Sequence, residues 1–210
     1  TNEVREFEQD IEKYTKSKFC VSLNSGTDAL MMAMWAAGIK KGDEIIQPPI
    51  SFIATTGATI HVGAKPVYCD VADDQLIDVN KIESCITKKT KAIMPVHWAG
   101  KTCDMEKILK IARKYKLIVI EDSAQSMGSY YKNKHSGTFG LAGAVSCHPL
   151  KNLNALGDGG LLLTNKLRIA EKVKLMRNHG IKSRDNVTMY GVNSRLDSLN
   201  AEVLKMRLKR

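Results

Sequence analysis

The chain has 210 residues, of which 32 are Lys or Arg and 22 are Asp or Glu, so its formal net charge at pH 7 is +10. With 43% hydrophobic residues it is too apolar for a disordered tail, and its length fits one large domain with a buried core. No apolar run approaches the roughly 20 residues of a membrane-spanning helix, and the first residues lack the pattern of a signal peptide. We therefore expect a cytoplasmic protein without a membrane partner.

The distribution of charge and the cysteines argue against two further classes of function. The lysines fall on the polar faces of expected helices and in turns, and the aromatic residues, at 6%, do not alternate with basic ones. We therefore do not expect nucleic acid as a partner. The five cysteines are scattered, without a C-x-x-C pair or the Cys/His spacing of zinc sites, so we interpret them as reduced packing thiols and expect no metal.

Short apolar segments rich in β-branched residues alternate with segments of helical periodicity. The expected strands are 20–24, 44–48, 66–71, 92–97, 117–122, 144–148 and 159–164. The expected helices are 27–38, 52–62, 79–86, 104–115 and 167–177, with further amphipathic helical patterns at both ends. This alternation predicts an α/β fold, a three-layer α/β/α arrangement whose mostly parallel sheet is covered on both faces. Because the last pattern stops inside a helix, we expect the chain to be part of a longer protein.

The loop after the first expected strand is a candidate phosphate site. Ligands of open α/β sheets bind outside the carboxyl ends of the strands, where such loops converge. Here Gly26 lets the backbone approach a ligand, and Thr27 and Asp28 begin a helix whose free N–H groups suit an anion. The alternative is that Ser25, Thr27 or Asp28 simply caps the helix.

Two more loops carry candidate chemistry. Glu121 and Asp122 end a strongly apolar strand, where burying a carboxylate costs free energy unless a cation pairs with it, so one of the two is expected to face a partner. The alternative is a helix-capping Asp beside a solvated Glu. Lys151 follows a strand in a Pro-marked turn, before the glycine-rich return 157–160, and a partly desolvated amine there can attack a carbonyl, although most lysines are surface charges. A phosphate cradle, a buried acid and a placed amine are what pyridoxal phosphate requires.

With these motifs the chain resembles the DegT/DnrJ/EryC1/StrS family, the pyridoxal-phosphate-dependent nucleotide-sugar aminotransferases of fold type I. The similarity begins at about Phe7 and runs through NSGTDAL, GAKPVYCDV, KTKAIMPVHWAG, VIEDSAQSMGSYYK, HPLKNLNALGDGG and NSRLDSLNAEVL, in the order typical of the family. The resemblance implies that 1–210 is the large cofactor-binding domain, and that a short preceding segment and a smaller C-terminal domain lie outside this sequence.

The resemblance implies roles for individual residues. Lys151 matches the lysine that bonds to the cofactor aldehyde and carries the substrate proton, and Asp122 matches the carboxylate that pairs with the pyridinium nitrogen. Gln125 matches the residue that hydrogen-bonds to the ring hydroxyl. Phe52 matches the aromatic residue that stacks on the ring, whereas the sequence alone favours an ordinary core phenylalanine.

The resemblance also implies how the phosphate is held and what the partners are. The matching phosphate ligands are Gly26, Thr27, Asp28 and Ser146, completed by Asn193, or less closely by its neighbour Arg195, from the second subunit of a homodimer. His148 and His97 lie close to the motifs and either help to place the substrates or are ordinary core or surface histidines.

The implied reaction transfers an amino group, usually from glutamate, to a keto group of a nucleotide-linked deoxy sugar, with C3 favoured over C4. Lys151, where related dehydratases have histidine, favours transamination. Two alternatives stay open: a non-catalytic or regulatory paralogue that keeps the fold and cofactor, and a basic α/β module for nucleotides or nucleic acid in which the motifs are coincidental.

Overall fold

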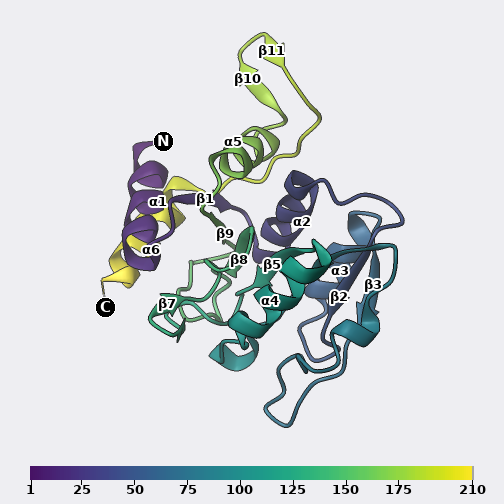
Figure 1. The fold of residues 1–210 in the computed structure, drawn as a ribbon. Helices are drawn as coiled ribbons and strands as arrows, with labels where there is room; N and C mark the ends of the chain where they lie inside the picture. Colours follow the sequence, from purple (N-terminus) through teal and green to yellow (C-terminus); the bar gives the residue numbers. More distant parts are fainter. Residues whose placement is uncertain (210) are drawn as a thin grey trace.

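A computed structural model describes residues 1–209 of the protein, built around one central sheet (Figure 1). Its strands are β1 (Phe19–Leu23), β2 (Glu44–Gln47), β3 (Lys65–Tyr68), β4 (Thr90–Ile93), β5 (Ile118–Asp122), β8 (Ala142–Ser146) and β9 (Gly160–Thr164). They lie in the order β1-β9-β8-β5-β4-β2-β3, in which β8, β5, β4, β2 and β3 pair in parallel and β9 is antiparallel to both neighbours. The prediction of a mostly parallel sheet is confirmed.

Helices cover both faces of the sheet. They are α1 (Asn2–Thr15), α2 (Gly26–Ala37), α3 (Ala54–His61), α4 (Met105–Tyr115), α5 (Leu167–Met176) and α6 (Ser198–Leu208). Alternate strand residues serve the two faces: Leu162 packs with α2 and α5, whereas Leu161 and Leu163 pack with α1 and α6. Helix α4 packs on the same side as α1 and α6 but toward the β2 end, and Figure 1 shows α1 and α6 side by side. The predicted three layers are confirmed.

The expected helix 79–86 is wrong, because only a short 3-10 turn, η1 (Glu83–Cys85), forms there. The buried Ile82 anchors the segment, but Ile86 already has an extended backbone at φ −77° and ψ 127°, so the helical pattern has too few residues to continue. The expected strand 92–97 is also too long. β4 ends at Ile93 because Pro95 has no N–H for the sheet ladder, and a single bridge follows at Val96.

Two small hairpins had no counterpart in the predicted elements. They are β6–β7 (Tyr130–Tyr131 and Lys134–His135) and β10–β11 (Ile181–Ser183 and Asn186–Val187), and the second projects from the body of the molecule in Figure 1. Strands of two or three residues are too short to show a period of alternation, which is why the sequence pattern missed them.

Close backbone packing joins the start of α2 to the neighbouring strands. A Cβ atom on Gly160 would lie 2.1 Å from the carbonyl oxygen of Ser25, and one on Gly26 would lie 2.9 Å from the Cβ of Ser146. Only glycine fits at either position without moving the backbone. These glycines therefore bring the start of α2 directly against the end of β8 and the beginning of β9.

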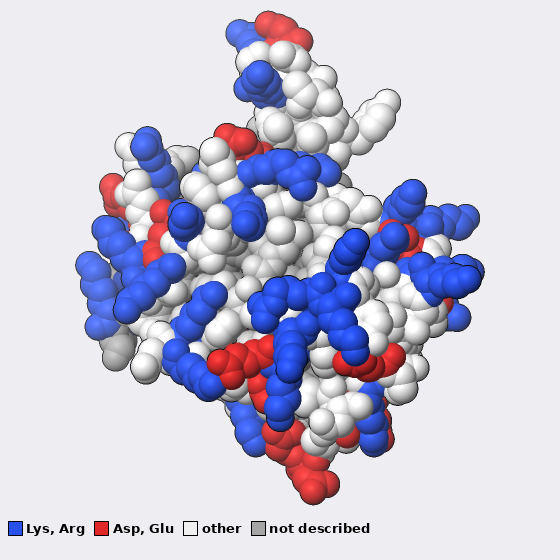
Figure 2. Space-filling model, in the orientation of Figure 1, with Lys and Arg blue, Asp and Glu red and all other residues white. Residues whose placement is uncertain are grey.

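The surface of the described residues mixes both signs of charge. Figure 2 shows lysine and arginine side chains over much of the visible face with acidic side chains beside them. Several are paired, as in Lys114 with Glu83 (Nζ to Oε2, 2.7 Å) and Lys107 with Asp104 (Nζ to Oδ2, 3.2 Å). Within this part of the chain, none of the helices combines the length and the apolar character needed to cross a bilayer.

Candidate active site

A cavity of about 350 Å³ lies at the carboxyl ends of β1, β2, β4, β5 and β8. This is the edge at which open α/β sheets bind ligands, and the volume is in the range of small-molecule sites. Among the residues that line it are seven candidates from the sequence: Gly26, Thr27, Phe52, Asp122, Gln125, Ser146 and Lys151. The fold therefore brings residues from four separate motifs to one place.

The start of α2 forms one end of the cavity. Ser25 is the N-cap, and its Oγ accepts a hydrogen bond from the N–H of Asp28 at 3.1 Å. The first turn of a helix leaves further N–H groups without intrahelical acceptors, and here Gly26 and Thr27 carry them at the cavity wall, next to Ser146. Capping and anion binding, which the sequence left as alternatives, are thus compatible in this loop.

A buried carboxylate forms the floor of the cavity. Asp122 is 5% exposed; its Oδ2 accepts from the Thr55 hydroxyl at 2.6 Å and its Oδ1 from the N–H of Ala124 at 3.1 Å. Burial raises the pKa of Asp122 above its ordinary value, and these two hydrogen bonds to the ionised form oppose that rise. A cation that entered the cavity would therefore gain strongly by pairing with Asp122.

The neighbouring Glu121 has a different role, and the alternative of a solvated glutamate is wrong. Its side chain is fully buried and accepts three backbone N–H groups of the loop 137–140 at 2.7 to 2.8 Å. It also lies 3.0 Å from Nε2 of the buried His97. Since His97 Nδ1 accepts the N–H of Cys103, its Nε2 carries the proton that Glu121 accepts. Glu121 and His97 support the loops beneath the cavity and do not line it.

Three further side chains reach the cavity from different loops. Lys151, in the turn after β8, is partly exposed and lines the wall. Phe52 is 64% exposed at the rim, so the alternative of a core phenylalanine is wrong. The Oε1 atom of Gln125 accepts the N–H of Ala99 at 3.0 Å, which leaves the amide nitrogen as the end that can donate to a ligand.

Two predicted site residues do not line the cavity. Asp28 faces an adjacent open cleft, which it shares with Asp158 and Arg195. Asn193 is exposed on the segment after β11, where its backbone pairs with Asn178, and the Arg195 guanidinium donates to the Asn178 side chain at 2.9 Å. His148 does line the cavity, although nothing in the sequence distinguished it from a surface histidine.

Sequence reasoning missed Ser51, Thr55 and Asp158, which also line the cavity. Ser51 and Thr55 are four residues apart and flank Phe52, so two hydroxyl groups at helical spacing beside a motif residue were the signal that could have found them. The cysteines match their interpretation as thiols, since all five are free, and burial raises the pKa of Cys147, next to Ser146, to about 12.

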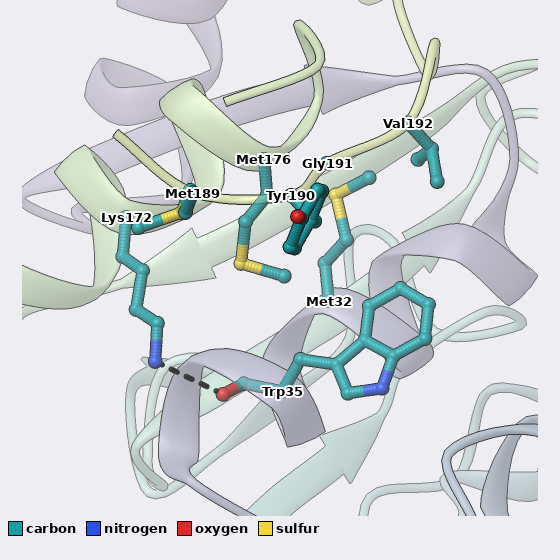
Figure 3. A pocket seen from close by; sticks show the side chains of 8 residues that line it. All are labelled: Met32, Trp35, Lys172, Met176, Met189, Tyr190, Gly191 and Val192. Carbon is teal, nitrogen blue, oxygen red and sulfur yellow. Dashed lines mark hydrogen bonds between the residues drawn. The ribbon is translucent and has the colours of Figure 1, made fainter. Parts of the chain in front are cut away.

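A second hollow, of about 420 Å³, lies between α2, α5 and the segment 189–192 (Figure 3). It is lined mainly by apolar side chains: Met32, Trp35, Met176, Met189, Tyr190 and Val192. Its charged residue, Lys172, donates to the carbonyl oxygens of Trp35 at 3.2 Å and Ala36 at 3.5 Å, as Figure 3 shows for Trp35. The ammonium group in this hollow thus already has acceptors within the fold.

A sheet that gathers an amine, a buried carboxylate and a helix N-terminus at its carboxyl edge has the architecture of an aminotransferase cofactor domain. The model of the DegT/DnrJ/EryC1/StrS aminotransferase family matches residues 1–210, and the chain belongs to this family. Membership of the family excludes the alternative of a basic α/β module in which the aminotransferase motifs are coincidental.

Two curated relatives illustrate the range of the family. A pleiotropic regulatory protein of Geobacillus stearothermophilus is 42% identical over 97% of this chain and 55% of its own length. A UDP-N-acetyl-3-dehydro-alpha-D-glucosamine 3-aminotransferase of Acidithiobacillus ferrooxidans is 42% identical over 97% of this chain and 56% of its own. The chain thus spans about half the length of the curated relatives it matches.

Solved structures share the fold closely. DesV of Streptomyces venezuelae, in complex with a ketimine intermediate, has a TM-score of 0.96 at 36% identity, covering 99% of this chain and 56% of its own. NtdA of Bacillus subtilis, with bound cofactor PMP, has a TM-score of 0.93 at 35% identity, covering 99% of this chain and 48% of its own.

Proposed function

We propose that this chain is the large cofactor-binding domain of a pyridoxal-phosphate-dependent sugar aminotransferase. The enzyme would move an amino group from an amino acid, glutamate, to a keto group at C3 of a nucleotide-linked deoxy sugar. The observation that carries the proposal is the single cavity lined by Lys151, Asp122 and the Gly26-Thr27 end of α2. The name of the Acidithiobacillus relative, an aminotransferase acting at C3 of a UDP-sugar, supports the choice of substrate.

The residues present fit pyridoxal phosphate. N–H groups at Gly26 and Thr27 and the Ser146 hydroxyl supply donors for a phosphate, and the lack of a Cβ on Gly26 lets this end of α2 lie directly against Ser146, so that the donors share one place. The buried Asp122 suits a protonated pyridine nitrogen. When bound, the cofactor supplies an aldehyde that takes up the amino group and a ring that accepts electrons from the substrate carbon.

The chain's own side chains would perform the remaining tasks. The Lys151 amine would hold the aldehyde covalently, and its Nζ would then move the proton at the substrate carbon. The amide nitrogen of Gln125 would donate to the ring hydroxyl, and the exposed Phe52 ring would cover one face of the cofactor. Asp122 would keep the ring nitrogen protonated throughout.

We also propose a homodimer in which Asn193 of one copy completes the phosphate end of the other. Within residues 1–209 the Asn193 side chain makes no hydrogen bond, whereas that of Arg195 is held by Asn178. This difference favours Asn193 over Arg195 as the residue that reaches the phosphate end of the second copy. A positively charged chain suits the diphosphate of a nucleotide sugar.

The test uses the full-length protein that contains this chain. Wild type should take up pyridoxal phosphate and gain a visible absorption band, and glutamate should bleach that band. Lys151→Ala should lose the band and lower turnover by roughly a thousandfold or more, because the nucleophile and proton carrier are gone. Lys172→Ala, a lysine outside the cavity, is the matched control and should retain both. A colourless wild type that takes up no cofactor would contradict the proposal.

A second candidate function is regulatory, and the name of the Geobacillus relative favours it. A regulatory paralogue would bind the cofactor and show the visible band, but no amino acid would bleach it. If glutamate does bleach the band, UDP- and dTDP-linked 3-keto sugars should restore it, which would identify the acceptor. Restoration by 4-keto sugars alone would correct the carbon assignment.

A further inference from the structure

Two hydroxyl groups connect the Asp122 carboxylate to the wall of the cavity. The Oγ atoms of Ser51 and Thr55 lie 2.5 Å apart, and Thr55 Oγ1 lies 2.6 Å from Oδ2 of Asp122. Thr55 is 1% exposed and stands in the first turn of α3. The chain of contacts joins residues 67 positions apart in the sequence.

The chemistry of the three groups fixes the direction of the hydrogen bonds. An ionised carboxylate only accepts, so the single Thr55 proton is donated to Asp122. Ser51 must then donate its own proton to Thr55. The order is therefore Ser51 to Thr55 to Asp122, in which each bond polarises the next. Hydrogen bonds to an ionised acceptor are about twice as strong as neutral ones.

We propose that Thr55 is a positioning residue, whose hydroxyl keeps the buried Asp122 carboxylate ionised and aimed so that it can pair with a pyridinium nitrogen, while Ser51 orients that hydroxyl. This rests on the proposed function. The other donor to Asp122, the N–H of Ala124, comes from the backbone and cannot be removed by most substitutions. The ionisation and orientation of Asp122 therefore depend directly on the side chain of Thr55.

Two titratable groups face Asp122 from other elements, His97 from the loop after β4 and Lys151 from the loop after β8. The positive charge of Lys151 favours the carboxylate, whereas His97 is a neutral ring whose Nδ1 accepts the N–H of Cys103 and whose Nε2 donates to Glu121. Neither donates a hydrogen bond to Asp122. Without the Thr55 hydroxyl, burial would be opposed less and the pKa of Asp122 would rise further.

The experiment measures binding of pyridoxamine 5′-phosphate, which needs no covalent bond, by calorimetry across a pH series in the full-length protein. Thr55→Val keeps the shape of the side chain and removes the donor. We expect affinity to fall about tenfold to a hundredfold, and the pH below which affinity is lost to move upward by about one unit or more. Thr55→Ser should restore both, and Ser51→Ala should move both in the same direction by less.

Thr56→Val is the matched control on the same helix, because Thr56 bonds to Gln47 (2.7 Å) and Tyr68 (3.2 Å) and not to Asp122. It should bind as wild type does. An unshifted pH dependence in folded Thr55→Val would overturn the inference and leave the proposed function intact. If Thr55→Val does not fold, an unshifted Ser51→Ala overturns it instead. A wild type that binds no cofactor defeats the proposed function, and this inference with it.

Discussion

The two hollows of this molecule have similar volumes, about 350 and 420 Å³, and both border α2. They differ in where their lining comes from. The cavity with Lys151 and Asp122 is built from loops that leave the ends of parallel strands, whereas the apolar hollow of Figure 3 lies between two helices and the segment 189–192 and is lined mainly by methionine and aromatic side chains. Volume alone therefore does not identify a site.

The two lysines make the distinction concrete. Lys172 in the apolar hollow donates to two carbonyl oxygens at the end of α2, so its ammonium already has partners. Lys151 lines a wall that faces a buried carboxylate across the cavity. What marks a functional cavity is hydrogen-bonding and charge capacity that the fold itself does not satisfy. The predictions below test this comparison, beginning with the largest effect.

The first prediction concerns the charged network beneath the cavity. Glu121→Gln replaces an acceptor of three backbone N–H groups and one histidine by an amide whose NH2 must face two of these donors, since each carboxylate oxygen accepts two. We expect the free energy of unfolding, measured by chemical denaturation, to fall by about 3 kcal/mol or more.

The control for this prediction is Glu106→Gln, which removes an exposed carboxylate that pairs only with Lys132 on the surface. It should leave the free energy of unfolding nearly unchanged. If both variants lose the same small amount of free energy of unfolding, the Glu121 charge does not support the loop 137–140 beneath the cavity.

The second prediction concerns the buried Asp122 carboxylate in the cavity. Burial raises the pKa of Asp122 above its ordinary 3.8, so the folded state binds more protons than the unfolded state between these values. Stability of the cofactor-free protein should therefore fall as pH rises through that window. Asp122→Asn should be more stable than wild type at pH 7, with the gain vanishing below pH 3.8.

The same variant should bind pyridoxal phosphate less tightly, because the asparagine cannot pair with a pyridinium nitrogen. Denaturation at a series of pH values gives the first effect, and cofactor titration gives the second. A gain in stability together with a loss of binding is the trade-off expected of a functional residue. A variant that is less stable than wild type at pH 7 would show that Asp122 is mainly structural.

The sequence alone predicted the layers and much of the site, for a physical reason in each case. Short, continuous apolar segments between helical ones specify a sheet covered on both faces. The topology of such a sheet places the carboxyl ends of its strands together, so Gly26, Asp122 and Lys151 could be grouped from the sequence. The roles of Glu121 and Thr55 could not be predicted. Their partners are distant in the sequence. Glu121 bonds to the loop 137–140, which begins 16 residues later, and Thr55 bonds to Asp122, 67 residues later.

The smallest effect is expected in the apolar hollow. Lys172→Met removes two hydrogen bonds to carbonyl oxygens at the C-terminal end of α2, but its apolar side chain suits the methionine-lined wall. We expect the free energy of unfolding to fall by less than about 1 kcal/mol. Cofactor binding and turnover should not change, since none of the cavity residues contacts this lysine.

Lys174→Met is the matched control, because it changes the net charge equally from an exposed position in the last turn of the same helix. Differences between the two variants then report on the hydrogen bonds to α2 and not on charge. If Lys172→Met weakened cofactor binding while Lys174→Met did not, the end of α2 would transmit strain to its beginning at Gly26. The two hollows would then be one coupled system, and the comparison between them would fail.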